Sequence, residues 1–190
     1  MRQFLFVGVL IVTLIFGGEP LINNFYKLLD QDGIIKIEIH FSQKQFENSF
    51  SSSGSFYLID ELNYCYDSPS FQILADDSLM TTINYETNQV VYSSVNKRQL
   101  GIFDILSGNK EFIEFSDNNN NDYVNNFIVD GLGYSGSFEF DIDTGTLKLI
   151  KLEISDSQII LIDIISIDIV KDYIMPNFDK NKFEIVDLRG

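Results

Sequence analysis

The sequence predicts a mainly β protein of the α+β class, built on a strongly curved antiparallel sheet with a few short helices. Three observations carry this prediction. The 190 residues include 17 Phe and 9 Tyr but no Trp, and aromatic and β-branched side chains favour strands. Apolar and polar residues alternate in many short segments, as in half-buried strands. In two later segments this alternation shifts by one residue, which indicates β-bulges and therefore curvature.

Composition narrows the function classes. The chain is long enough for one domain. With 28 acidic and 13 basic residues its formal charge is −15, which disfavours nucleic acid as a partner. Cys65 is the only cysteine and His40 the only histidine, so neither a disulfide nor a zinc cluster is predicted. The serines at 51–53 have no histidine partner nearby. We therefore predict a protein that is not an enzyme and has no metal or cofactor.

The first 18 residues read as a signal peptide. Arg2 precedes an apolar run over 4–16, which is shorter than the roughly 20 residues that a membrane span needs. Gly17 and Gly18 follow as small residues, although Phe16 is unusual near a cleavage site. An uncleaved N-terminal anchor is the alternative. Export would leave residues 19–190 as an acidic domain in the periplasm.

A helix and a half-buried strand open this domain. Apolar residues at spacings of three and four predict an amphipathic helix over 19–31, which Gly33 closes. The period then becomes two. Ile35, Ile37, Ile39 and Phe41 share one face of a strand and His40 lies on the polar face, where we expect it to be solvated.

Short strands are predicted next, with one further helix. The strands are 56–59, 63–67, 71–75, 79–84 and 89–94. Asp76–Asp77 is predicted as a two-residue turn because Asp tolerates positive φ. The period becomes helical again over 99–106. Residues 117–126 are predicted as an Asn-rich loop, and Cys65 as an unpaired structural cysteine.

The bulged segments lie in the last third of the chain. Phe138, Phe140 and Ile142 alternate with acidic residues, and a turn follows. A phase shift near Leu149–Ile150 predicts a bulge in the next strand. The long strand 158–170 slips phase again after Ile164. We expect the two short helices to cover part of the concave face of the curved sheet, leaving an apolar cavity beneath them.

Several segments, in order along the chain, resemble the family of periplasmic outer-membrane lipoprotein carriers (the LolA family). In the stretch 73–90, six residues stand at positions that match the family pattern: Asp76, Glu86, Thr87, Asn88, Gln89 and Val90. Phe41-Ser42-Gln43 looks like the "F-x-Q" of the family's first strand. Gly54-Ser55-Phe56, Pro69 and Phe183 to Leu188 are similar to later family features. The resemblance implies an unclosed antiparallel half-barrel with short helices inside its concave face.

The sequence also departs from the family pattern. The family's arginine–proline pair, whose arginine is implicated in holding the helical lid shut, aligns with Asp60–Glu61, where the charge is reversed. The hairpin glycine is replaced by Asp77, a tryptophan by Thr81 and a tyrosine by Ile83. The arginine latch is therefore absent from this chain.

The resemblance implies a carrier that binds the acyl chains of lipoproteins and shuttles them from the inner to the outer membrane. Its implied partners are acylated lipoproteins, an inner-membrane ABC-type lipoprotein-release complex and an outer-membrane lipoprotein acceptor, with the carrier itself a monomer. The predicted acyl-chain-binding residues are Ile37, Ile39, Phe41, Phe56, Leu58, Tyr64, Tyr66, Ile73 and Leu79. The predicted lid residues are Leu21, Phe25, Leu28, Leu100, Phe103 and Leu106.

A non-transporting module with the same half-barrel is the alternative. It would bind lipid or protein as an envelope-stress sensor or an outer-membrane acceptor. Acceptors of this type are usually lipidated, and no cysteine follows the apolar run here. Stress sensors usually carry a second domain, for which 190 residues leave no room. Each predicted site residue could equally be an ordinary core residue.

Overall fold

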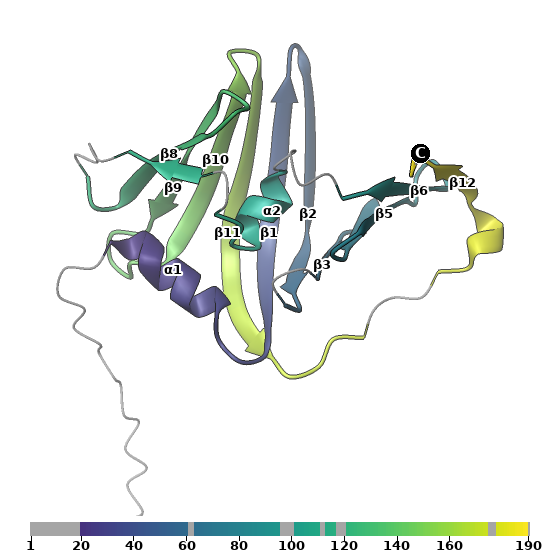
Figure 1. The fold of residues 1–190 in the computed structure, drawn as a ribbon, viewed down its shortest axis with the longest axis horizontal. Helices are drawn as coiled ribbons and strands as arrows, with labels where there is room; N and C mark the ends of the chain where they lie inside the picture. Colours follow the sequence, from purple (N-terminus) through teal and green to yellow (C-terminus); the bar gives the residue numbers. More distant parts are fainter. Residues whose placement is uncertain are drawn as a thin grey trace, which may run out of the picture.

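A single open sheet forms the body of the protein. The computed structural model describes residues 20–60, 63–95, 101–110, 113–116, 121–174 and 178–189. The twelve strands are ordered β12-β6-β5-β4-β3-β2-β1-β11-β10-β9-β8-β7. Every neighbouring pair is antiparallel except β12 with β6. The sheet bends around two short helices without closing (Figure 1), which confirms the predicted curved, unclosed half-barrel.

The elements have the following bounds: α1 (Leu21–Leu29), β1 (Ile34–Gln45), β2 (Asn48–Leu58), β3 (Tyr64–Asp67), β4 (Phe71–Ala75), β5 (Leu79–Asn84), β6 (Gln89–Ser94), α2 (Ile102–Leu106), β7 (Ile113–Phe115), β8 (Val124–Val129), β9 (Tyr134–Phe140), β10 (Leu147–Ser155), β11 (Gln158–Val170), η1 (Lys180–Lys182) and β12 (Glu184–Asp187). Among the described residues, none of the helices combines the length and the apolar character that a membrane crossing requires.

Both predicted phase shifts appear as bulges. In β10, Leu147 pairs with Phe140 and Leu149 with Glu139, so the extra residue is Lys148, just ahead of the predicted position. In the β1–β11 pair the register shifts at Ile165, as the slip after Ile164 predicted. Each bulge lets the strand continue to bury its apolar residues while it bends.

Three local predictions were wrong. β2 begins at Asn48, eight residues before the predicted start, because its serine-rich part pairs with β1 along the whole hairpin. Residues 124–126 belong to β8 and not to the Asn-rich loop, of which 117–120 lie outside the described residues. Ile142 follows the end of β9 and is 67% exposed.

The turn at Asp76 forms for a different reason from the predicted one. Neither Asp76 nor Asp77 has a positive φ. Instead, the Asp76 carboxylate accepts hydrogen bonds from the backbone N–H groups of Ser78 and Leu79, at 2.9 and 2.7 Å. An aspartate that bonds the backbone two residues on makes such a turn without left-handed geometry. The same bonds lower the pKa of Asp76.

The two faces of the sheet are covered differently. We call the face that carries Ile37, Phe56 and Tyr66 the concave face; α1 and α2 pack on it, α1 over β8–β10 and α2 over β1 and β2 (Figure 1). The opposite, convex face of β2 and β3 is crossed by the segment after β11. There the Tyr173 ring lies 4.3 Å from that of Tyr57, between centroids. The chain then adds β12 beside β6.

Candidate functional site

The predicted acyl-binding residues form one apolar wall, with a single exception. Residues paired across neighbouring strands point to the same face. Ile37 pairs with Phe56, Phe56 with Tyr66, and Tyr66 with Ile73, so these four side chains share the concave face. The remaining members of this wall are Ile39, Phe41, Leu58 and Tyr64.

The exception is Leu79. It shares a face with Thr81 and Ile83, and Ile83 pairs with Gln72 on the strand next to it. Gln72 alternates with Ile73, so Leu79 points to the convex face. The alternation of apolar and polar residues predicts the bounds of this strand correctly. It does not show which of the strand's two faces points to the concave side.

One glycine allows the wall to pack closely. Gly54 lies on β2 opposite Ile39. A Cβ atom at Gly54 would come within 2.3 Å of the backbone oxygen of Asp67 and 3.0 Å of the Tyr66 ring. The Tyr66 ring therefore occupies the space that any other residue would fill. Its hydroxyl donates a hydrogen bond to Ser52 Oγ at 3.2 Å, which satisfies the polar end of a fully buried side chain.

The cover of this wall is the five-residue helix α2. The Phe103 ring stacks on three rings of the wall: Tyr66 at 4.9 Å, Phe56 at 6.0 Å and Phe41 at 6.1 Å between centroids. The interplanar angle with Phe56 is only 6°. A single half-buried ring thus covers the centre of the concave face.

A carboxylate holds α2 to the sheet. Asp104 Oδ1 accepts a hydrogen bond from the Tyr64 hydroxyl at 3.0 Å, and Asp104 Oδ2 accepts one from the Gly101 backbone N–H at 2.7 Å. The first bond joins α2 to β3 and the second caps the start of the helix. Burial raises the pKa of Asp104, although both hydrogen bonds favour the charged form and partly offset it. Burial likewise raises the pKa of Tyr64.

The predicted lid residues are only part of the helices' buried faces. Phe25 and Leu106 are buried, Leu21 and Phe103 are half-buried against the core, and Leu28 is half-buried away from it. Leu100 lies outside the described residues. The predicted lid residues leave out four further buried side chains on the two helices, of which the helical spacing marked only Ile22: Ile22, Tyr26, Ile102 and Ile105.

The other half of the concave face is a second aromatic cluster under α1. Phe25 and Tyr26 lie 6.1 and 6.4 Å from the Phe138 ring, and Tyr26 is 6.4 Å from Phe115. The Tyr26 hydroxyl has no hydrogen-bond partner among the described residues, and its burial raises the pKa. Asn125 Oδ1, on the strand beside Phe138, is also without a partner in that set.

Among the described residues, the centre of this wall is tightly covered. Ile37, Phe56 and Tyr66 are each 0% exposed, so no solvent-sized space adjoins them. The reason is that Phe103 and the apolar face of α1 fill the concave side to the close packing usual for protein interiors. The structure is therefore that of a closed form, in which a ligand would have to take the place of a helix.

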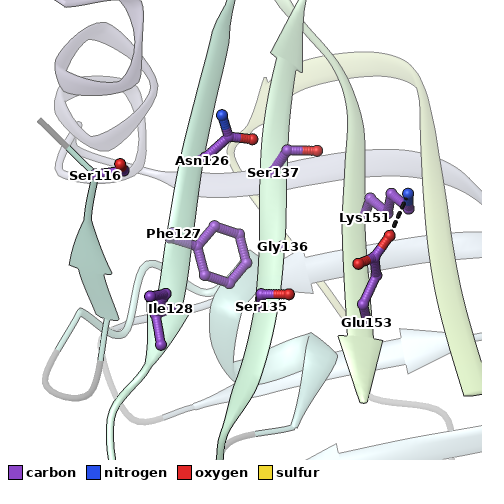
Figure 2. A pocket seen from close by; sticks show the side chains of 9 residues that line it. All are labelled: Ser116, Asn126, Phe127, Ile128, Ser135, Gly136, Ser137, Lys151 and Glu153. Carbon is purple, nitrogen blue, oxygen red and sulfur yellow. Dashed lines mark ion pairs between the residues drawn. The ribbon is translucent and has the colours of Figure 1, made fainter. Parts of the chain in front are cut away.

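A pocket of about 330 Å³ does lie on the convex face of β8–β10. Its lining residues come from β8, β9 and β10, together with Ser116 just after β7, and the Lys151–Glu153 ion pair lies at one side (Figure 2). Serine, asparagine and charged groups make up most of it: Ser116, Asn126, Ser135, Ser137, Lys151 and Glu153, with Phe127, Ile128 and Gly136. This lining does not suit a hydrocarbon chain.

The reactive side chains singled out in the sequence have structural partners. Cys65 is fully buried and accepts a hydrogen bond from the Tyr173 hydroxyl at 2.9 Å; burial raises its pKa to about 11. His40 is within 2.9 Å of Ser53 Oγ on the polar face. Across the described residues, no three His, Cys, Asp or Glu side chains gather closely enough to hold a metal.

Comparison with known proteins identifies the fold. No family model matches the sequence, and no curated protein matches it. A crystal structure of an uncharacterized conserved protein from Thermus thermophilus matches with a TM-score of 0.52 and 6% identity, covering 87% of this chain and 96% of that one. The two proteins therefore share a fold.

Two further crystal structures match at lower scores. A LolA superfamily protein from Nitrosomonas europaea has a TM-score of 0.47 and 9% identity, with 86% of this chain and 96% of that one covered. A DUF1329 family protein from Desulfovibrio piger has a TM-score of 0.45 and 11% identity, with 80% and 94% covered.

Proposed function

We propose that this protein is a periplasmic carrier that binds the acyl chains of lipoproteins against its concave wall. It would receive them from an inner-membrane ABC-type release complex and deliver them to an outer-membrane acceptor. Residues 1–18 would direct its export. The proposal assigns no catalytic step and no cofactor to the protein.

The observation that carries the proposal is the Phe103 stack. The centre of an apolar concave wall is covered by one ring from a five-residue helix, and not by a second sheet. So short a helix is not stable alone and keeps its shape through its contacts. Displacing α2 would expose a continuous surface of aromatic and aliphatic groups, while α1 keeps the rest of the core covered.

The energies allow exchange between the helix and a ligand. Burying one methylene contributes about 0.8 kcal/mol, so a chain of a dozen contributes roughly 10 kcal/mol. Displacing Phe103 and its neighbours on α2 costs part of that gain, because they must leave the wall. A carrier needs this competition, since a helix that refills the wall helps to release the cargo.

The Asp104–Tyr64 hydrogen bond would act as the latch in place of the family's arginine. Asp60, at the position of that arginine in our alignment, accepts hydrogen bonds from Asn63 within its own turn, where it stabilises the approach to β3. Asp104 instead reaches β3 from the lid itself. A buried hydroxyl–carboxylate bond is directional and weak enough to break during each cycle.

Acyl binding is tested directly with the purified exported protein. A fluorescent fatty acid is titrated into the wild type and into a Leu58→Asp variant, which places a charge on the wall. An Ile165→Asp variant, which places the same charge at a 69% exposed convex-face position, is the matched control. We expect saturable binding by the wild type and the control, and loss of binding in Leu58→Asp provided circular dichroism shows it folded.

Transport is tested separately in cells. Depletion of the protein should cause lipoproteins to accumulate at the inner membrane, and lipoproteins should co-purify with the periplasmic protein. Absence of saturable acyl binding would contradict the carrier. A single stable protein partner without lipid would instead support the non-transporting module.

A further inference from the structure

The tip of the β1–β2 hairpin carries two exposed phenylalanines. Phe46 is 69% exposed and Phe50 is 46% exposed. In Figure 1 this hairpin ends beside the tip of the β10–β11 hairpin, at the end of the sheet away from α1. The Phe46 N–H donates a hydrogen bond to the Ser157 backbone oxygen at 2.9 Å, which joins the two tips. The phenylalanines therefore stand on a supported projection of the sheet.

The backbone at Phe46 is strained. Its φ is +55°, a left-handed conformation that glycine and asparagine adopt readily but a bulky aromatic residue rarely does. Its ring is mostly in solvent, so folding gains little by burying it. Strained residues that persist without a packing reason are found mainly at functional sites. The two-residue turn between Gln45 and Asn48 accounts for the positive φ, but it does not require an aromatic side chain there.

The charge of the tip differs from that of the protein. The whole chain carries −15, whereas residues 43–51 include one cation, Lys44, and one anion, Glu47. Asp156, at the neighbouring tip, is the one further charge there. The other tip residues are Gln, Asn and Ser. With Asp156 included, the two tips together carry a formal charge of −1, against −15 for the whole chain. A tip with so little charge can approach a surface of low charge, whereas the protein as a whole is repelled by an anionic one.

One of the two exposed rings, that of Phe50, is in contact with the covered wall. Phe50 lies 6.0 Å from Phe41 and 5.9 Å from Phe71, between ring centroids. Phe41 in turn stacks on Phe103 of α2. A row of rings therefore runs from the exposed tip to the residue that covers the concave face.

We propose that this tip docks on an electrically neutral lipid bilayer, with Phe46 and Phe50 inserted among the headgroups. A projecting tip with two apolar rings in a rim of uncharged polar side chains fits the interfacial region of a bilayer, where rings are buried and amides and hydroxyls stay hydrated. This contact needs no cargo, so it is independent of the proposed carrier function. It would bring the row of rings to the surface in which acyl chains reside.

The absence of tryptophan from the chain gives a site-specific test. Phe46→Trp introduces a single tryptophan at the tip, and Ile142→Trp introduces one at a similarly exposed residue in the β9–β10 turn. On addition of phosphatidylcholine vesicles we expect a blue shift of emission, and quenching by brominated lipid, for Phe46→Trp. Ile142→Trp should show neither. Equal responses at both positions, or no response at position 46, would overturn the proposal.

Co-sedimentation with the same vesicles measures how much the two phenylalanines contribute to the affinity for lipid. The double variant Phe46→Asn/Phe50→Ser should bind at least about tenfold more weakly than the wild type, and Ile142→Asn should bind equally well. Phe46→Asn should not lower the melting temperature, because asparagine suits the left-handed backbone. Mass spectrometry of the exported protein establishes whether the apolar residues 4–16, which bind lipid by themselves, are still attached.

The remaining outcomes are also decisive. A wild type that ignores vesicles but elutes as a dimer, and becomes monomeric in Phe46→Asn, would overturn the lipid assignment in favour of self-association. Fatty-acid binding in the double variant should equal that of the wild type. Loss of vesicle binding with retained fatty-acid binding supports the docking tip, whereas loss of fatty-acid binding in the wild type concerns the carrier function only.

Discussion

The two halves of the concave face are both aromatic, yet they are covered in different ways. Over β7–β10, the nine-residue helix α1 inserts two rings that meet their neighbours at tilted or edge-on angles. Over β1–β3, the five-residue helix α2 contributes one ring that lies nearly flat on three others. A flat stack can slide apart without disturbing the wall, whereas interlocked rings cannot. We therefore expect α2 to move and α1 to stay.

The two helices also differ in the polar contacts that they make with the sheet. Asp104 ties α2 to the sheet through Tyr64. The Tyr26 hydroxyl on α1 has no hydrogen-bond partner among the described residues, although the Lys110 ammonium lies 4.0 Å from the centroid of the Tyr26 ring. The end of α1 also lies against Gly108, where a Cβ atom would come within 2.9 Å of Leu29. This contact joins the end of α1 to the segment just after α2.

The largest expected effect is on stability, from Phe25→Ala. Phe25 is 4% exposed, and truncating a buried phenylalanine leaves a cavity, so the free energy of unfolding should fall by about 3–4 kcal/mol. Urea denaturation measures it, with Leu28→Ala on the same helix as a control that should lose less than about 1 kcal/mol. If Phe25→Ala tightened acyl binding at little cost in stability, α1 would be the moving cover.

Phe103→Ala should affect stability less than Phe25→Ala does, and acyl affinity more. The ring is only half-buried, so the loss in free energy of unfolding should be about 1–2 kcal/mol. Because the ring competes with cargo for the wall, affinity for a fluorescent fatty acid should rise about tenfold. A drop in affinity would mean that Phe103 belongs to the binding surface.

Removing the latch should have a smaller effect in the same direction. Tyr64→Phe deletes only the hydroxyl that bonds Asp104, which should destabilise the closed form by about 1 kcal/mol and raise acyl affinity about fivefold. Tyr134→Phe, on the α1 half, is the matched control and should leave acyl affinity unchanged. Equal effects of the two variants would remove the distinction between the halves.

The latch should also respond to pH. Burial places the pKa of Asp104 in the folded protein above its value in the unfolded chain, so the folded state binds the proton more tightly. Asp104 therefore lowers stability at neutral pH, and this penalty disappears as pH falls through the folded pKa. Asp104→Asn should be stabilised relative to the wild type at pH 7, with a difference that shrinks on acidification. The other carboxylates contribute equally to the pH dependence of stability in the two proteins, so their contribution cancels in the difference.

For the reactivity of Cys65 we expect no change when α2 is loosened. Cys65 lies on the convex face, buried beneath Tyr173, and its pKa is raised to about 11, so it should react slowly with iodoacetamide at pH 8. Phe103→Ala should not change this rate, because opening the concave face leaves the convex face covered. Faster labelling in that variant would show that the two faces open together.

Much of the fold follows from local pattern. β4, β5, β6 and β11 have the predicted bounds because turn residues and alternation both mark them. The serine-rich start of β2 has no strand signal of its own, since long-range pairing with β1 creates it. Leu79 was predicted on the concave face but lies on the convex face. Apolar residues do not distinguish the two faces of β5, because its convex face is also buried, as Ile83 shows.

The site was only partly predictable for a related reason. Apolar periodicity finds Phe103, but nothing in the sequence near Asp104 indicates that Tyr64 lies opposite it. Two residues forty positions apart meet only once the sheet has curved. Likewise, nothing in the sequence marks Phe46 as a residue with a left-handed backbone.

The position of β1 between β2 and β11 also bears on how the chain acquires its shape. Ile34 pairs with Val170, so the middle of the sheet joins an early strand to one of the last. Contacts so distant in sequence close slowly, because the intervening chain must first be ordered. A nascent chain that still lacks β11 cannot complete this seam, so the middle of the sheet can form only after the last strands have been synthesised.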